Sequence, residues 1–321
     1  MPYHTNEDLL TATRLLAAQA GERADLRTVG QTCAGRPIVA VTIALPGRPP
    51  APTRPQVLVT GNLHGNEVIG SELALRLLEL LAAPSPDEDA RALLEAADVT
   101  IVPAINLDSR DAGARALAAG RGFARSPRGN PHGVDLNRNF PFPATARDAW
   151  HPLAGTRHAW LPWYRGPHPL AEPEAQAVAD LAQRLRPRAS LTLHSVGELV
   201  LYPWCHSPEP PADREAFLAL AAAFTAAQPG RPYRVKQARA WYTILGDLDD
   251  WLYATFGTLA LTIELAAPLA GVGRNPLRLL SPLAWMNPRD PEPTLAITAI
   301  PCLRLLGEGV RQAAAPCQDR G

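Results

Sequence analysis

Residues 61–81 read GNLHGNEVIGSELALRLLELL, and they join the end of an apolar run, two polar residues and a helix-like pattern. The preceding run, QVLVTGN at residues 56–62, is typical of a buried strand in a mainly parallel sheet. Residues 70–81 are predicted to form a helix. His64 and Glu67 lie between the two, so we expect them near the carboxyl end of a strand, where open parallel sheets gather their ligands.

Strand-like and helix-like runs alternate along the rest of the chain. Strands are predicted at residues 38–45, 98–106, 189–195, 199–204 and 258–265. Helices are predicted at residues 8–20, 172–185, 213–226, 247–255 and 294–312. Residues 107–168 show no regular pattern, as expected for a long functional loop. The alternation predicts an α/β fold: a single domain over residues 1–321, with a mixed, mainly parallel central sheet flanked by helices.

The composition excludes several classes of partner. Lys and Arg balance Asp and Glu, so we expect neither a nucleic-acid partner nor a membrane partner. No apolar stretch is long enough to span a bilayer, and the first residues lack the features of a secretory signal. The cysteines have no paired spacing, which is typical of free thiols in a reducing compartment. We therefore expect a cytoplasmic protein without a propeptide.

Three apolar strands lead to polar residues that could perform chemistry. The first leads to His64 and Glu67, a later one ends in His194, and the last ends in Glu264. Two imidazoles and a carboxylate can hold Zn²⁺ with one coordination position open, which is typical of a catalytic zinc. Taken singly, the first three have ordinary alternatives as loop or strand-end residues. Glu264 is harder to explain in this way, because burying an unpaired carboxylate among apolar neighbours is costly.

The segment RGNPHGVDLNRNFP, at residues 128–141, completes a set of motifs. His-x-x-Glu, the GVDLNRN segment, a later strand-end His and a final strand-end Glu together resemble the zinc carboxypeptidases of the carboxypeptidase A type. The long spacings between these motifs fit as well, and the resemblance covers essentially the whole chain.

The resemblance implies catalytic roles. Three residues would bind one Zn²⁺ per chain: His64, Glu67 and His194. Asp135 would orient His64 through its other ring nitrogen. Arg128 would stabilise the oxyanion, and Glu264 would act as general base and then as general acid. Two other arginines of the same segment could take the place of Arg128: Arg121 and Arg125.

The resemblance also implies substrate-binding roles. Asn137 and Arg138 would bind the terminal carboxylate of the substrate, because a guanidinium suits that anion. Tyr242 would close over the bound carboxylate, with Tyr253 as its nearby rival.

Three acids follow Tyr242 in the sequence. Asp247 and Asp250 are interpreted as acids of a first helical turn, which the helix dipole favours. Asp249 falls where the family keeps a residue at the base of the side-chain pocket, and an acid there would favour a basic or other amine-bearing terminal residue.

The implied function is hydrolysis of the C-terminal peptide bond of peptides or peptide-like substrates with a free C-terminal carboxylate, through a zinc-activated water. Three alternatives stay open. HGNE and D-x-N-R also resemble zinc deacylases of small N-acyl amino acids, the aspartoacylase and succinylglutamate desuccinylase group. The GVDLNRNFP form and EPE, at residues 172–174, resemble bacterial cytoplasmic γ-D-glutamyl–diaminopimelate peptidases of cell-wall peptides. The third is an inactive fold that serves as a binding module, although no expected ligand is missing from the sequence.

Overall fold

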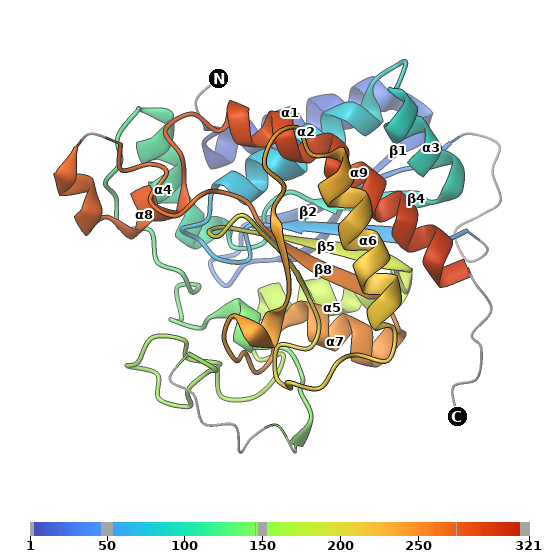
Figure 1. Ribbon diagram of the computed structural model, residues 1–321. Helices are drawn as coiled ribbons and strands as arrows, with labels where there is room; N and C mark the ends of the chain where they lie inside the picture. Colours follow the sequence, from blue (N-terminus) through green and yellow to red (C-terminus); the bar gives the residue numbers. More distant parts are fainter. Residues whose placement is uncertain (1–2, 46–53, 145, 147–152, 274, 315–321) are drawn as a thin grey trace.

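A central sheet of eight strands organises the part of the chain that the computed structural model describes, which is residues 3–45, 54–144, 146, 153–273 and 275–314. The strand order is β1-β2-β4-β3-β5-β8-β6-β7 (Figure 1). The strands are β1 (Ala24–Gln31), β2 (Pro37–Ile43), β3 (Gln56–Gly61), β4 (Asp98–Val102), β5 (Ala189–His194), β6 (Leu199–Tyr202), β7 (Arg234–Gln237) and β8 (Leu259–Glu264). The central strands β4, β3, β5 and β8 run parallel, whereas β2 and β6 are antiparallel to the strands β4 and β8 beside them. The predicted fold class, a mixed and mainly parallel sheet flanked by helices, is confirmed.

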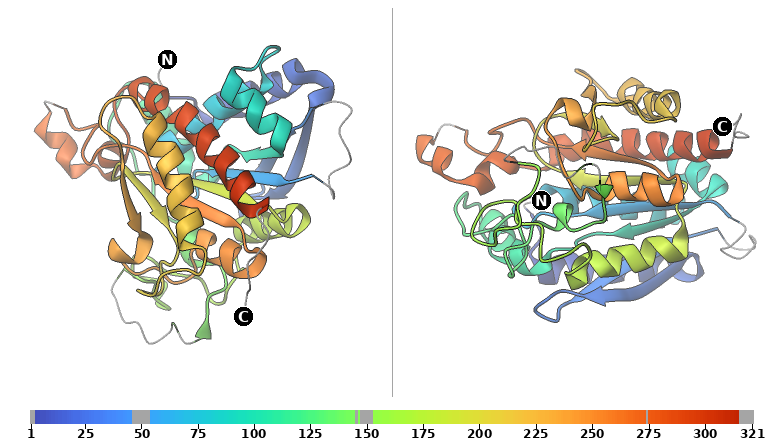
Figure 2. Two further views of the ribbon diagram at one scale, coloured as in Figure 1. Left: turned by 45° about the vertical axis from the view of Figure 1, so that its right-hand side comes forward. Right: turned by 90° about the horizontal axis from the view of Figure 1, so that it is seen from below.

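Helices cover both faces of this sheet. They are α1 (Asn6–Ala20), α2 (Ile69–Ala82), α3 (Glu88–Ala96), α4 (Leu107–Ala118), α5 (Pro173–Leu185), α6 (Arg214–Ala227), α7 (Leu248–Phe256), α8 (Pro282–Met286) and α9 (Glu292–Ala314). Helices α2, α6 and α9 pack on one face, and α5 and α7 pack on the other (Figures 1 and 2). None of the helices within the described residues combines the length and the apolar character that crossing a membrane requires.

Two apolar cores follow from this arrangement, because successive residues of a strand point to opposite faces. In β3, Val57 and Val59 pack in the core that α2 covers, and Leu58 packs in the core that α5 covers. All six residues of β3 are buried, and the same holds for β5 and β8. The continuous apolar run that predicted a buried parallel strand is explained by this cover on both faces.

The parallel strands bring distant residues to one edge of the sheet. Gly61 at the end of β3 pairs with Leu193 of β5, and the next residue, His194, pairs with Glu264 of β8. A Cβ at Gly61 would lie only 2.5 Å from the carbonyl oxygen of Pro103, so the chain needs glycine where it leaves β3 toward α2. The polar ends of three strands therefore meet at the carboxyl edge of the sheet.

The expectation of an irregular segment over residues 107–168 is wrong at its start, where α4 forms. Asn106 caps this helix by accepting a hydrogen bond from the backbone N–H of Ser109. The helix α3 and the edge strands β1 and β7 are also absent from the predicted pattern. Both edge strands consist of exposed or half-buried residues, so they lack the apolar run by which a strand is recognised.

Candidate active site

Three buried side chains meet at the carboxyl edge of the sheet. His64 and Glu67 lie in the loop between β3 and α2, and His194 ends β5. Each offers one ligand atom, and these atoms lie within 4.8 Å of one another. The Glu67 carboxylate lies between the imidazoles, with Oε1 2.9 Å from Nδ1 of His64 and Oε2 2.8 Å from Nδ1 of His194. The backbone N–H of Ser195 also donates to Oε2 of Glu67, which holds the carboxylate against β5. The structure thus brings together the three residues that the sequence analysis chose as metal ligands.

The hydrogen-bonding capacity of His64 tests whether a cation fits among these residues. Its Nε2 lies 3.1 Å from Asp135, and its Nδ1 lies 2.9 Å from Glu67, so both ring nitrogens face carboxylates. A neutral imidazole carries only one N–H. If Nε2 donates to Asp135, the lone pair of Nδ1 faces the negative charge of Glu67, and a divalent cation between them removes that repulsion. Two imidazole nitrogens and a carboxylate, with a carboxylate behind one imidazole, match a catalytic zinc site.

The charges of the ligand set suit metal binding. Burial raises the pKa of Glu67, but the charges of His64 and His194 and their hydrogen bonds lower it by more. The pKa of Glu67 therefore lies below its usual range, and the carboxylate is ionised. Burial lowers the pKa of His194, against the opposing charge of Glu67. His194 is therefore neutral at pH 7, which is the form that binds a metal.

Asp135 and Arg128 brace the ligands from behind. Arg128 donates from Nε to Asp135 at 2.8 Å and from Nη1 to Oε1 of Glu67 at 3.1 Å. Burial raises the pKa of Asp135, but the positive charges of Arg128 and Arg138, together with His64, hold it well below its usual range. Asp135 is thus a permanent anion behind His64, and a quarter of the Arg128 side chain is exposed beside it.

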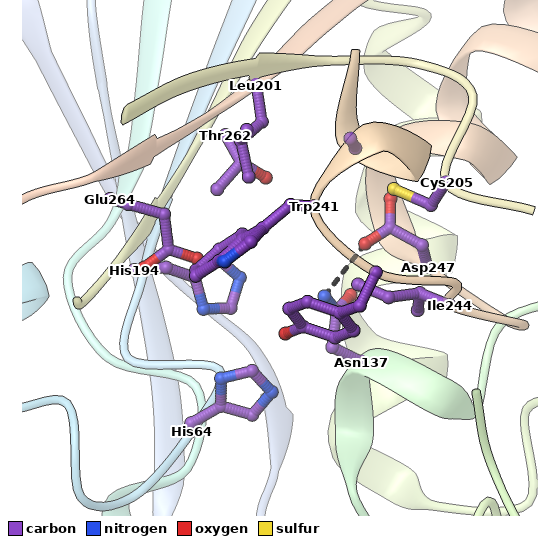
Figure 3. Close-up of a pocket in the computed structure, with 12 residues that line it drawn as sticks. His64, Asn137, His194, Leu201, Cys205, Trp241, Ile244, Asp247, Thr262 and Glu264 are labelled. Carbon is purple, nitrogen blue, oxygen red and sulfur yellow. Dashed lines mark hydrogen bonds between the residues drawn. The ribbon is translucent and has the colours of Figure 1, made fainter. Parts of the chain in front are cut away.

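Glu264 faces the same hollow from the end of β8. Figure 3 shows the carboxylate of Glu264 beside His194, and His64 lines the same pocket. Burial raises the pKa of Glu264 well above its usual range, and the charge of Glu67 adds to the rise while Arg128 opposes it. Its Oε2 and the Nε2 of His194 are buried, and neither has a hydrogen-bond partner within the described residues. A buried carboxyl group with a raised pKa and a free oxygen beside a cation site is suited to proton transfer.

The pocket that contains these groups extends away from the ligands. Its lining is His64, Asn137, His194, Leu201, Cys205, Ala238, Trp241, Tyr242, Ile244, Asp247, Thr262 and Glu264. Asn137 and Tyr242, both expected to bind substrate, are therefore in place. Thr262 was not chosen from the sequence, although it lies two residues before Glu264 in β8 and so shares its face. Cys205 and Ile244 carry no sequence pattern that points to the pocket.

Arg138 lies behind the pocket lining. Its guanidinium is buried and donates to the backbone carbonyl of Leu153 at 3.2 and 3.0 Å and to that of Asn137 at 3.0 Å. Leu153 takes the Nε hydrogen and one Nη2 hydrogen, and Asn137 takes one Nη1 hydrogen, so one hydrogen remains on each of Nη1 and Nη2. The direct contact of Arg138 with a substrate carboxylate stays a prediction.

Asp249 is not among the residues that line the pocket. Its two oxygens accept hydrogen bonds from the hydroxyls of Thr192 and Thr262, both at 2.6 Å, and Thr262 stands between it and the pocket. These threonines of β5 and β8 hold the carboxyl group of Asp249 beneath the lining, and its role at the base of the side-chain pocket stays a prediction. Of the three acids that follow Tyr242, Asp247 is the one that lines the pocket.

The other two acids of α7 differ in role. Asp247 caps the helix, as the first-turn interpretation suggests, by accepting from the backbone N–H groups of Asp249 and Asp250. Asp250 does more than complement the helix dipole. It accepts from the backbone N–H groups of Cys205 and His206 and from Nδ1 of His206 at 2.6 Å, so it fixes a loop of the pocket wall.

Comparisons with known proteins agree with this geometry. A family model described as zinc carboxypeptidase matches residues 9–269. The chain is 27% identical to carboxypeptidase SOL1 of Arabidopsis thaliana over 278 residues, which cover 82% of this chain and 50% of the relative. It is 27% identical to the carboxypeptidase N catalytic chain of Rattus norvegicus over 289 residues, which cover 82% of this chain and 63% of the relative. It thus spans about half to two thirds of the length of these curated relatives. The crystal structure of carboxypeptidase A from Helicoverpa armigera has the same fold, with a TM-score of 0.75 and 22% identity over 99% of this chain and 75% of the other.

Proposed function

The chain belongs to the zinc carboxypeptidase family, and from this premise we propose that it is a zinc metallocarboxypeptidase that removes the C-terminal residue of peptides. One observation carries the proposal: the ligand atoms of His64, Glu67 and His194 lie within 4.8 Å of one another, and Glu264 faces the same pocket. The preferred substrate would be a peptide or peptide-like molecule with a free C-terminal carboxylate.

The cation would be held by His64, Glu67 and His194. When bound, Zn²⁺ supplies a Lewis acid that lowers the pKa of water and polarises a carbonyl group. The remaining chemistry belongs to side chains of this chain. Glu264 would take a proton from the attacking water through its free Oε2 and then deliver that proton to the leaving amine.

Arg128 would stabilise the oxyanion that develops on the scissile carbonyl. Its Nε and one hydrogen of Nη1 are engaged by Asp135 and Glu67, so the hydrogens of Nη2 and the second hydrogen of Nη1 remain for the oxyanion. The two bonds fix the guanidinium before the substrate arrives, and a fixed dipole costs little reorganisation in the transition state.

Asn137 and Tyr242 would bind the terminal carboxylate from the pocket lining. Burial raises the pKa of Tyr242, although Arg128 and Arg138 oppose the rise, so its hydroxyl stays a donor. Arg138 would add its charge from behind this lining, and a direct contact with the substrate would use the hydrogens of Nη1 and Nη2 that Asn137 and Leu153 leave free.

Hydrolysis of a blocked dipeptide by the zinc-loaded chain tests the proposal, with the same dipeptide as its C-terminal amide and an N-acyl amino acid as comparisons. We expect turnover of the free acid and a loss of at least about 100-fold for the amide, because a neutral amide forfeits charge-assisted hydrogen bonds. Faster hydrolysis of the N-acyl amino acid would instead establish the deacylase alternative. Cleavage of neither substrate by a zinc-loaded chain would favour a binding module.

The finer expectations from the sequence stay predictions. These are the bacterial cytoplasmic branch, the cytoplasmic location, the γ-D-glutamyl–diaminopimelate substrate and the preference for an amine-bearing terminal residue. Screening peptides and cell-wall peptides that vary in their terminal residue would test the substrate predictions, and fractionation of the native cells would test the location.

A further inference from the structure

The carboxamide of Asn137 is held on both sides by the amino end of α7. Its Nδ2 donates to Oδ1 of Asp247 at 2.8 Å, and its Oδ1 accepts from the backbone N–H of Leu248 at 2.9 Å. The side chain of Asn137 is buried and lines the pocket near His64 (Figure 3). A segment more than one hundred residues away in sequence therefore determines how this amide is oriented.

These two contacts settle which amide atom is the donor. A backbone N–H can only donate, so the atom that faces Leu248 is the oxygen of Asn137, and the atom that faces the Asp247 carboxylate is the nitrogen. An NH₂ group carries two hydrogens, and one of them is directed at Asp247. The second is available to a ligand in the pocket, and a donor at this position suits an anionic group such as a carboxylate.

Asp247 is shared between two tasks. Its Oδ2 accepts from the backbone N–H groups of Asp249 and Asp250, which caps α7, and its Oδ1 accepts from Asn137. The thiol of Cys205 also lies against this carboxylate. The cap needs one oxygen, which Ser or Asn also supplies. The contact with Asn137 needs a second acceptor on the same side chain, and a carboxylate supplies both at once.

We propose that Asp247 is a positioning residue that holds the carboxamide of Asn137 with Nδ2 presented to the pocket, where it meets the carboxylate of the ligand. The inference rests on the proposed function and adds a residue that acts through Asn137. It distinguishes Asp247 from an ordinary helix cap, whose loss would affect stability without affecting ligand binding.

Two variants separate the tasks. Asp247→Asn keeps the size of the side chain and one capping oxygen, but its NH₂ group would face the NH₂ group of Asn137. Asp247→Ser keeps a capping oxygen and is too short to reach Asn137 at the same time. A matched control is Asp87→Ser at the cap of α3, where Asp87 accepts from the backbone N–H of Ala90. Helix α3 lies on the face of the sheet opposite to α7 (Figure 1).

The measurements are KM and kcat for the blocked dipeptide and the Kd of benzylsuccinate, a small dicarboxylate, for each zinc-loaded protein. For both Asp247 variants we expect KM and Kd to rise about tenfold with kcat changed less than about twofold, as for one lost hydrogen bond to a charged ligand. Asp87→Ser should leave all three constants unchanged. Unchanged KM and Kd in the Asp247 variants, with an active parent, would overturn the inference and leave the proposed function intact.

If the parent neither hydrolyses the dipeptide nor binds benzylsuccinate, that result counts against the proposed function itself. A crystal structure of the Asp247→Asn variant still tests the positioning role in that case. A carboxamide of Asn137 displaced from the backbone N–H of Leu248 supports the positioning role. A carboxamide in its original place overturns it.

Discussion

Glu264 carries the proton chemistry at the scale of single residues. The Glu264→Gln variant keeps the shape of the side chain and removes its basicity, so kcat should fall by about 10²–10⁴-fold, the usual range for loss of a general base. Zinc binding should persist, because Glu264 is not one of the three ligands. Kinetics and metal analysis of the same preparation check both expectations. Hydrolysis at the parental rate would remove Glu264 from the mechanism.

Asp135 governs the tautomer of His64. In Asp135→Asn the amide would present a donor or a neutral acceptor to Nε2 of His64, in place of the carboxylate at 3.1 Å. We expect zinc affinity to fall about 10–100-fold, the range found for partners of metal-binding histidines. Competition with a chelator measures this affinity. An unchanged affinity would mean that Asp135 contributes only through Arg128.

The ligand residues were predictable because each lies where an apolar strand ends, and apolar runs are visible in a sequence. The contacts of Arg138 and Asp249 were not. Arg138 is bound by a carbonyl of Leu153, in a segment without a regular pattern, and Asp249 is bound by threonines from two other strands. Such contacts depend on how distant segments pack, which spacing along the chain does not encode.

At the scale of elements, the first turn of α7 ties together the walls of the pocket. Asp247 holds Asn137, Asp249 holds β5 and β8 through their threonines, and Asp250 holds the loop at Cys205. An acid-rich first turn is visible in the sequence and was interpreted there mainly through the helix dipole. The structure shows that each acid also has a partner outside the helix.

This turn should make stability depend on pH through Asp249. Burial, with the charge of Asp247, raises the pKa of Asp249 to about 8, against hydrogen bonds from Thr192 and Thr262 that lower it. The unfolded pKa is about 3.9, so the folded state retains a proton that the unfolded state loses between pH 4 and 8. The stabilisation of the folded state by this proton is fully present below about pH 4 and is lost as the pH rises through 8. Between these limits the free energy of unfolding falls by up to about 1.4 kcal/mol per pH unit.

Asp249→Asn cannot ionise and should lack this slope. Urea unfolding of the parent and the variant at pH 5, 7 and 9 gives the difference in the free energy of unfolding at each pH. We expect the stability of the parent relative to the variant to decline as the pH rises, and Asp87→Asn on the exposed cap of α3 to follow the parent. A difference that does not change with pH would show that Asp249 is already ionised at pH 5.

The elements themselves were predicted unevenly. Strands covered on both faces, such as β3 and β8, are continuous apolar runs and were found. The edge strand β1 is largely exposed, so its sequence, ADLRTVGQ, resembles a loop. The helix α4 was missed because four polar residues follow Leu107 in its sequence, LDSRDAGARALA, and its buried face consists largely of polar and small residues instead of large apolar ones.

At the scale of the whole molecule, the topology explains why a site can form from residues more than one hundred positions apart. Parallel strands end at the same edge, so the central strands β3, β5 and β8 bring the ligands and Glu264 together while helices on both faces bury the sheet. This much follows from the alternation of strands and helices. The strand order and the contacts of the long loops depend on the three-dimensional packing and were not predictable.

Zinc-edge anomalous diffraction from crystals of the zinc-loaded chain tests the central claim most directly. The account predicts one strong peak per chain, about 2.0–2.2 Å from Nδ1 of His64, a carboxylate oxygen of Glu67 and Nδ1 of His194, with Glu264 facing its open side. A peak bound by other residues, or no peak at these three side chains, would contradict it.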